Sequence, residues 1–146
     1  ASCLVGSEMC IRDRASDEDL HWLHPGDDLR TIARHWLDLG PSLMVITCGG
    51  SGILALTDRG LSLSIPSHPA KVVDTVGAGD SFMSGLLDGL WSAELLGVEH
   101  RDDLAAIDGA TLRRILTRCA HIGAITVSRA GANPPTLADL GEDARN

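Results

Sequence analysis

The chain has 146 residues, of which 44% are hydrophobic and 22% charged, so it is long enough for one domain with a hydrophobic core. Its formal net charge of -8 disfavours nonspecific binding to nucleic acid or to an anionic membrane. No apolar run is long enough to cross a bilayer, no basic secretory leader is visible, and the four cysteines have neither metal-ligand nor disulfide-dense spacing. We therefore expect a globular cytoplasmic protein.

Residues 1–14 do not fit the pattern of the chain that follows. A strand would be expected to lead into Ser16, yet Gly6–Arg14 has neither alternation nor a continuous apolar run. The string Ser-Glu-Met-Cys-Ile-Arg-Asp-Arg within this segment resembles the translation of a sequencing adapter. We interpret residues 1–14 as a non-native segment, with a divergent N-terminus as the alternative. Sequencing the source locus through this junction distinguishes the two.

The segment from Ser16 to Leu39 is predicted to be helical. Ser16, followed three residues later by Asp19, has the form of a capping box at the start of a helix. Apolar residues then recur at helical spacing. The pattern is broken at Pro25-Gly26 and ends at Gly40-Pro41, which predicts two consecutive helices.

Three short apolar segments follow, and each has the pattern of a strand. The first two are continuously apolar and the third alternates between apolar and polar residues: 43–47, 53–57 and 61–65. Glycines lie between the first two segments, with the spacing Thr47-x-Gly49-x-x-Gly52. Taken alone this spacing is a weak signal, because glycines are common in hairpin turns.

The stretch Val72–Phe82 is the feature around which the rest of the chain is organised. A strand predicted at 71–73 leads into a glycine loop, and from Asp80 onward apolar residues recur every three to four positions, which predicts a helix. Gly77 and Gly79 allow a tight turn in which peptide N–H groups converge at the helix N-terminus, a natural site for phosphate. A carboxylate beside such a site is electrostatically unfavourable unless it has a chemical role. Asp80 is therefore a candidate general base, and helix capping is the alternative.

The remainder of the chain is predicted to be mostly helical. The segment 97–109 is acidic and polar, which indicates a surface connector with a short helix. Thr111 is predicted to cap a long helix with apolar residues at helical spacing. Ala120, Gly123 and Ala124 on this helix are small enough to admit a close neighbour or a flat ring.

The heptapeptide Asp-Thr-Val-Gly-Ala-Gly-Asp at 74–80 resembles the D-T-x-G-A-G-D signature of the ribokinase-like (PfkB) carbohydrate kinases. Six fixed identities in seven positions make this a specific signal. The resemblance extends from about Ser16 to about Leu137 and is closest to fructokinase-type members. It implies an α/β fold, the ribokinase-like (Rossmann-like) three-layer sandwich, of which this chain is the C-terminal portion. Residues 15–146 would be the nucleotide-binding part, without the sugar-binding half.

The resemblance also implies roles for individual residues. Asp80 would take a proton from a sugar hydroxyl as the catalytic base. The backbone N–H groups of Gly77, Ala78 and Gly79, with that of Asp80, would form the anion hole for the γ-phosphoryl group. The implied ATP site consists of Thr47, Gly49, Gly52, Gly79, Ala120 and His121. For His121, a purely structural role on the helix is the alternative.

Metal ions are implied in the same way. The expected nucleotide is ATP with Mg²⁺ bridging its phosphates, and K⁺ is a further expectation. The ending 128–135 resembles the family's Arg-x-Gly-Ala-x-Pro loop, and the matching positions for a monovalent cation are Asp74, Val76, Thr126, Arg129 and Gly131. Ordinary loop chemistry explains these residues equally well. Ser16 and Asp19 stand where many members have an N-x-x-E motif, and helix capping explains them without magnesium.

The implied function is ATP-dependent phosphorylation of a sugar hydroxyl, fructokinase-like, by a parent protein of which this chain is a fragment that is inactive alone. A nucleotide-binding fragment without catalysis and a nucleoside kinase of the same family are the alternatives. A dinucleotide-binding G-x-G-x-x-G fails because no glycine lies between Gly79 and Gly85, and the absence of a Gly-Lys pair excludes a P-loop. The expected partners are a small-molecule sugar and ATP, without nucleic acid or membrane, and the parent is expected to be a homodimer.

Overall fold

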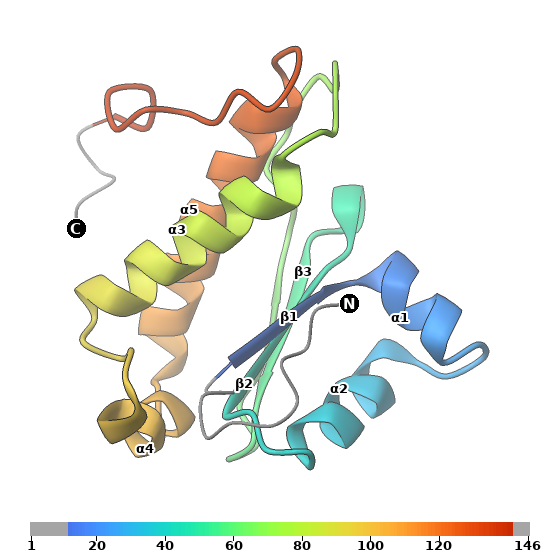
Figure 1. The fold of residues 1–146 in the computed structure, drawn as a ribbon, viewed down its shortest axis with the longest axis vertical. Helices are drawn as coiled ribbons and strands as arrows, with labels where there is room; N and C mark the ends of the chain where they lie inside the picture. Colours follow the sequence, from blue (N-terminus) through green and yellow to red (C-terminus); the bar gives the residue numbers. More distant parts are fainter. Residues whose placement is uncertain (1–11, 142–146) are drawn as a thin grey trace.

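The computed structural model describes residues 12–141, in which a four-stranded sheet lies between two layers of helices (Figure 1). The strand order is β1 (Arg12–Ser16), β2 (Leu43–Thr47), β3 (Ile53–Thr57) and β4 (Ser62–Ile65). β1 pairs with β2 in parallel, whereas the β2–β3 and β3–β4 pairs are antiparallel. The predicted α/β class, with a partly parallel sheet and a hairpin after β2, is confirmed.

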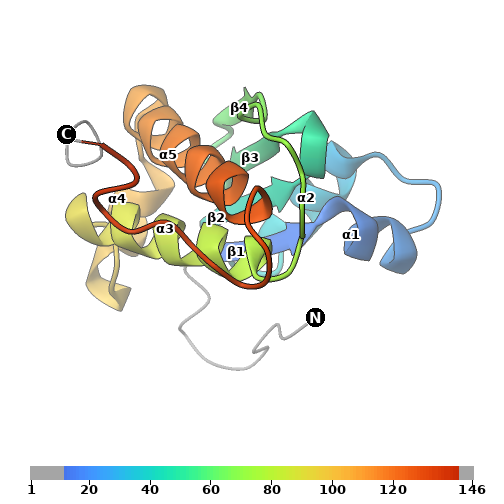
Figure 2. The same ribbon diagram turned by 90° about the horizontal axis from the view of Figure 1, so that it is seen from above.

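The helices form the outer layers of this sandwich. α1 (Asp17–Leu23) and α2 (Leu29–Leu37) cover one face of the sheet, and α3 (Ala78–Ser92) and α5 (Gly109–Val127) cover the other (Figures 1 and 2). Short helical segments complete the fold: η1 (Gly49–Ser51), η2 (Val98–His100) and α4 (Arg101–Ala105). No helix within residues 12–141 combines the length and apolar character that spanning a bilayer requires.

The continuously apolar pattern of the two central strands follows from this layering. Successive side chains of a strand point to opposite faces, and here helices cover both faces, so both sets must be apolar. The residues packed against α3 and α5 include Leu43, Val45, Ile53 and Ala55, and those packed against α1 and α2 include Met44, Ile46, Leu54 and Leu56. One face of the sheet therefore packs against α3 and α5, and this packing positions the glycine turn at the start of α3.

α3 and α5 run antiparallel and side by side (Figure 2). Two glycines of α3 allow this close approach. A Cβ at Gly85 would lie 2.6 Å from Cδ1 of Ile122, and a Cβ at Gly89 would lie 2.7 Å from Cγ2 of Ile115. Both distances are far inside van der Waals contact, so larger residues at these positions would push the helices apart.

The strand predicted at 71–73 is absent from the structure, and that prediction is wrong. The N–H groups of Val73 and Asp74 both donate to the carbonyl of Val127, at 2.7 and 3.2 Å. Because these peptide groups bind the C-terminal end of α5, the segment is a loop that crosses that helix end. Among the described residues, no strand pairs with it.

The predicted cap of α5 is also wrong. Asp108, and not Thr111, is the N-cap: its carboxylate accepts hydrogen bonds from the N–H groups of Ala110 and Thr111, each at 2.9 Å. The long helix therefore begins at Gly109, two residues before the predicted cap. A carboxylate also interacts favourably with the partial positive charge of a helix N-terminus.

β1 includes the end of the segment that we interpret as non-native. Arg12–Arg14 lie in this strand although their side-chain pattern gave no strand signal, because backbone pairing with β2 defines the element. Residues 1–11 lie outside the described residues. The origin of residues 1–14 therefore stays a prediction.

Candidate phosphate and nucleotide site

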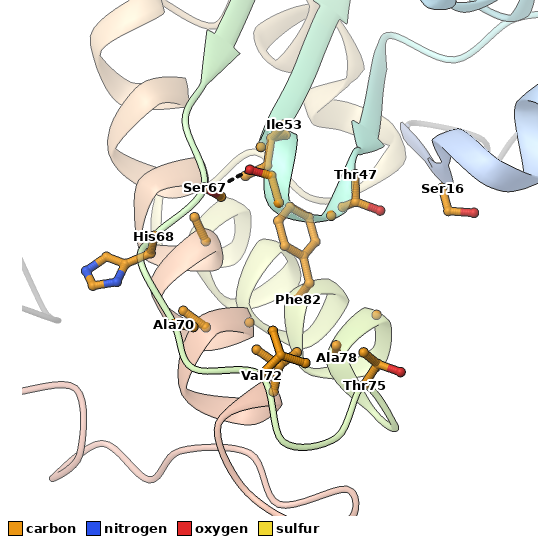
Figure 3. A pocket seen from close by; sticks show the side chains of 18 of the residues that line it. Ser16, Thr47, Ile53, Ser67, His68, Ala70, Val72, Thr75, Ala78 and Phe82 are labelled. Atoms are coloured by element: carbon orange, nitrogen blue, oxygen red, sulfur yellow. Dashed lines mark hydrogen bonds between the residues drawn. The ribbon is translucent and has the colours of Figure 1, made fainter.

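A cavity of about 590 Å³ lies where β1 and β2 end and α3 begins (Figure 3). The carboxyl ends of parallel strands are the usual place for a ligand in α/β folds. Four parts of the chain line the cavity: the strand ends, the loop after β4, the start of α3 and one face of α5. The lining residues are Arg14, Ser16, Asp17, Glu18, Thr47, Gly49, Gly50, Gly52, Ile53, Ser67, His68, Pro69, Ala70, Val72, Thr75, Ala78, Gly79, Phe82, Ala120, Gly123, Ala124 and Val127. The two glycine loops, far apart in sequence, thus meet at one cavity.

The first turn of α3 presents free peptide N–H groups beside this cavity. Within residues 12–141, the N–H groups of Gly77, Gly79 and Asp80 have no hydrogen-bond partner. The N–H of Ala78 donates to the carbonyl of Thr75 at 3.2 Å, so this amide, predicted to belong to the anion hole, is already engaged. Three of the four predicted donors therefore remain available at a helix N-terminus, where partial positive charge favours an anion.

Gly77 has a backbone conformation that other residues rarely adopt, with φ of +77°. A Cβ there would also lie 2.8 Å from the Cβ of Ala132. Glycine at this position is thus required by both conformation and space. At Gly79, a Cβ would lie 2.7 Å from Nη2 of Arg14, so a guanidinium group stands directly beside the turn.

Arg14 was missed by the sequence interpretation because it lies in the segment set aside as non-native. Its side chain lines the cavity, and its Nε is buried without a hydrogen-bond partner among the described residues. A cation beside an anion-binding turn strengthens the attraction for phosphate.

Asp80 lies in the first turn of α3 with an exposed side chain that does not enter the core. Within the described part of the chain, its carboxylate makes neither a hydrogen bond nor an ion pair. The N-cap of α3 is Gly77, so Asp80 is not the capping residue. It does not line the cavity, although its neighbour Gly79 does. The carboxylate is therefore exposed and unpaired within the described residues, beside a residue that lines the cavity.

Asp74 joins the turn to the loop that follows α5. Its carboxylate accepts hydrogen bonds from the N–H groups of Val76 at 3.0 Å and Gly131 at 2.9 Å. These two bonds, with that from Val76 first, lower the pKa of Asp74 below its usual value. Three of the five positions predicted to hold a monovalent cation are thereby brought together.

The other two predicted cation positions lie at the end of α5. The carbonyl of Thr126 accepts the N–H of Arg129 at 3.2 Å, and a carbonyl oxygen engaged in this way retains one lone pair. The side chain of Arg129 forms an ion pair with Asp139 at 3.1 Å and donates to the carbonyl of Pro134 at 3.4 Å, so its guanidinium group is already engaged. Backbone oxygens, rather than the Arg129 side chain, are the groups here that suit a cation.

The small residues of α5 line one part of the cavity, and we call this part the slot. Ala120, Gly123 and Ala124 line it, and a Cβ at Gly123 would meet no atom within 4 Å. The loop that includes His68 and Ala70 also lines the cavity (Figure 3). Small and apolar lining residues of this kind leave open space that a flat ring could occupy.

His68 stacks on His121, with ring centroids 4.5 Å apart and an interplanar angle of 20°. His121, predicted to touch adenine, is not part of the cavity lining, whereas His68 is. Burial, and secondarily the proximity of His68, lower the pKa of His121. Sequence reasoning missed His68 because it lies in a segment that reads as a simple linker.

Ser16 and Asp19 form the predicted capping box. The Ser16 hydroxyl accepts the N–H of Asp19 at 3.1 Å and donates to its carboxylate at 2.6 Å, which confirms the capping interpretation. The acidic residues that line the cavity are instead Asp17 and Glu18. No cluster of three or more His, Cys, Asp or Glu side chains able to hold a metal ion occurs within residues 12–141.

Comparison with known proteins yields a consistent set of relatives. Residues 16–139 match the model of the pfkB family of carbohydrate kinases. The chain is 42% identical over 99 residues to a fructokinase of Rhizobium leguminosarum bv. trifolii. It is similar in structure to aminoimidazole riboside kinase from Salmonella enterica, complexed with aminoimidazole riboside and an ATP analog, with a TM-score of 0.64 and 26% identity. It is also similar to a fructokinase double mutant from Vibrio cholerae in a fructose-, ADP- and potassium-bound form, with a TM-score of 0.64 and 25% identity.

These relatives are much longer than the matched region. The match covers 67% of this chain but 29% of the Rhizobium fructokinase. The structural matches cover 90% and 88% of this chain, but 39% of the Salmonella protein and 37% of the Vibrio protein. The chain thus spans between a quarter and two-fifths of the length of the proteins that it resembles. The ribokinase-like fold of this portion is confirmed.

Proposed function

The chain belongs to the pfkB family of carbohydrate kinases, and on that premise we propose that residues 15–146 are the nucleotide-binding part of an ATP-dependent sugar kinase. In this proposal the parent protein phosphorylates a hydroxyl of fructose or a related sugar. The sugar-binding half lies in the part of the relatives that this chain does not match, so the isolated chain binds nucleotide without turnover.

One observation carries the proposal: free N–H groups at the start of α3 stand beside a cavity shared with a second glycine loop. Gly79 and Gly49 line the same cavity although thirty residues separate them in sequence. The phosphates would lie against the free N–H groups of Gly77, Gly79 and Asp80. The base would occupy the slot beside Gly123.

The chain's own groups account for the main requirements of phosphoryl transfer, which are positioning and charge neutralisation. Peptide N–H groups fixed by the helix stabilise charge that develops on the transferred group, and they need no rearrangement to do so. Asp80 accepts the proton of the attacking sugar hydroxyl at the open end of the turn. Thr47 and Gly52 line the cavity at the glycine loop between β2 and β3.

Two cations complete the proposal. Asp17 and Glu18, the acidic residues of the cavity lining, would bind Mg²⁺ directly or through water, and this ion would neutralise the phosphate oxygens of ATP. The loop pair joined by Asp74 is the proposed K⁺ site, with oxygens of Asp74, Val76, Thr126 and Gly131 as ligands. The potassium in the Vibrio fructokinase structure supports this choice of ion.

A nucleoside is the second candidate acceptor. The similarity to aminoimidazole riboside kinase, at 26% identity, specifically favours it. Fructose remains the first choice because the fructokinase of Rhizobium is 42% identical. Assaying the full-length protein encoded at the source locus with fructose, ribose and nucleosides ranks these acceptors by kcat/KM.

The role of Asp80 is tested in the same full-length protein. Asp80→Asn is expected to lower kcat by about 100-fold or more, the usual effect of losing a general base, while leaving ATP affinity nearly unchanged. Asp38→Asn is the matched control and should retain activity, because Asp38 is exposed at the end of α2, lies outside the cavity and makes no side-chain hydrogen bond or ion pair among the described residues. An Asp80→Asn enzyme with wild-type kcat would remove this residue from the mechanism.

A further inference from the structure

A buried hydrogen bond joins the two helices that form the proposed site. The Thr126 hydroxyl on α5 lies 2.9 Å from the Ser81 hydroxyl on α3. Thr126 is 0% exposed and Ser81 is 5% exposed, so water does not compete for this bond. It is a polar contact inside a seam that Gly85 and Gly89 otherwise keep closely packed.

The bond continues to the cavity wall. The Ser81 hydroxyl also lies 3.0 Å from the carbonyl of Ala78, which lines the cavity, and the Ser81 N–H donates to the carbonyl of Gly77 at 2.9 Å. Thr126 in turn lies 2.9 Å from the carbonyl of Ile122. A continuous path therefore runs from the body of α5, through two hydroxyls, to the turn that carries the anion-binding amides.

The bond between the two hydroxyls is present in two of the three ways in which their protons can be arranged. Each hydroxyl has one proton, so the pair can make two of its three possible bonds at a time. Thr126 can donate to Ser81 while Ser81 donates to the Ala78 carbonyl, or Ser81 can donate to Thr126 while Thr126 donates to the Ile122 carbonyl. In the third arrangement both hydroxyls donate to these carbonyls, and their oxygens remain in contact at 2.9 Å.

We propose that Ser81 and Thr126 are positioning residues that fix the anion-binding turn of α3 relative to the base-binding face of α5. This inference deepens the proposed function and rests on it. Neither hydroxyl touches the nucleotide. Their bond sets the distance between the amides that meet the phosphates and the slot that holds the base, so a ligand that spans both depends on it and a ligand that fills only the slot does not.

The test compares ATP with adenosine in the 146-residue chain. Thr126→Val removes the hydroxyl at nearly constant volume, and it should weaken ATP binding by about fivefold while changing adenosine binding by less than about twofold. Thr126→Ser, which keeps the hydroxyl, should restore ATP affinity. Thr117→Val is the matched control, because Thr117 is exposed on the same helix. Equal weakening of both ligands in Thr126→Val would overturn the proposal.

A second measurement needs no ligand and separates this inference from the proposed function. Amide hydrogen exchange at Ser81, whose N–H bonds to Gly77, should accelerate about fivefold in Thr126→Val. Exchange at Val45, in the core of the sheet, should not change. Unchanged Ser81 exchange, or equal acceleration at both positions, would overturn the positioning role. Failure of the wild-type chain to bind ATP would contradict the proposed function, and the exchange comparison would still decide whether the two hydroxyls position the turn.

Discussion

Gly77 is the residue on which the geometry of the site depends most. Its positive φ turns the chain into α3, so that the following peptide N–H groups become the first N–H groups of the helix. The nearby Ala132 leaves no room for a side chain. Conformation and packing thus both demand glycine at the point where the sequence motif has it.

Replacing this glycine should damage both stability and binding. Gly77→Ala is expected to lower the free energy of unfolding by about 1–2 kcal/mol, the cost of a left-handed conformation for a residue with a Cβ, and to weaken ATP binding. Chemical denaturation and calorimetric titration measure the two effects. Gly50→Ala is the control for stability, since Gly50 has neither a positive φ nor an atom within 4 Å of its Cβ position. Equal stability of the two variants would contradict this account of the turn.

At the scale of single elements, α5 has a face of small residues that line the cavity. One of them, a glycine, is unfavourable for helix stability. Gly123 lies in the helix interior, where glycine is about 1 kcal/mol less favourable than alanine. No atom lies within 4 Å of the position that its Cβ would take. Stability alone would therefore favour alanine here, and the empty space lies in the slot proposed for the base.

Gly123→Ala should accordingly separate stability from binding. The variant is expected to unfold at a higher temperature, and to bind both ATP and adenosine several-fold more weakly because the methyl group enters the slot. Thermal unfolding measures the change in stability, and titration with each ligand measures the change in affinity. A stabilised variant with unchanged affinity would show that the base does not lie against this part of α5.

The stack of His68 on His121 links α5 to the loop after β4. The contribution of His121 to the stability of the folded chain depends on pH. The pKa of His121 lies below its ordinary value of 6.5 in the folded chain, so the folded state binds fewer protons there than the unfolded state. The stabilisation is fully present above pH 6.5 and is lost as pH falls from that value through the lowered pKa. The aspartates with lowered pKa act at more acidic pH, because their ordinary value is 3.8: Asp28, Asp74, Asp108 and Asp139.

The melting temperature of the wild-type chain should therefore fall between pH 7.5 and pH 5.5. His121→Gln, which cannot be protonated in this range, should show a smaller fall over the same interval. Thermal unfolding of both proteins at several pH values measures the difference. Parallel curves for the two proteins would mean that the buried position of His121 beside His68 does not contribute to the pH dependence.

The elements differed in how far the sequence could predict them. β2, β3 and α3 were predictable because helices cover both faces of the sheet and because the apolar period of α3 is regular. The segment 71–73 has the β-branched residues of a strand, yet its N–H groups bond to the end of α5, a tertiary contact that local pattern does not encode. The stacking of His68 depends on a similar long-range contact.

For the site, the motif predicted the turn and the second glycine loop, since backbone conformation at glycine is a local property. Sequence could not show that the Ala78 N–H is taken by Thr75, or that Arg14 reaches Gly79. It also could not reveal the bond between Ser81 and Thr126, because the two residues are 45 positions apart. These features arise from packing between elements.

At the scale of the whole molecule, the fold brings three separate segments to one end of the sheet. The loop after β2, the turn before α3 and the C-terminal half of α5 meet there, while α1 and α2 support the opposite face. The relatives are about two and a half to three and a half times as long as the matched region. We base the proposed division of roles on this difference in length. This portion would hold the nucleotide, and the remainder would bring the sugar to Asp80.

The most direct test of the central claim is a nuclear magnetic resonance titration of the ¹⁵N-labelled chain with ATP and with adenosine. We predict that ATP shifts the amide signals of Gly77, Gly79 and Asp80 together with those of Ala120–Ala124. Adenosine should shift only the second group. If ATP leaves the three signals at the start of α3 unchanged, the peptide groups of this turn do not bind phosphate and the proposed function is wrong.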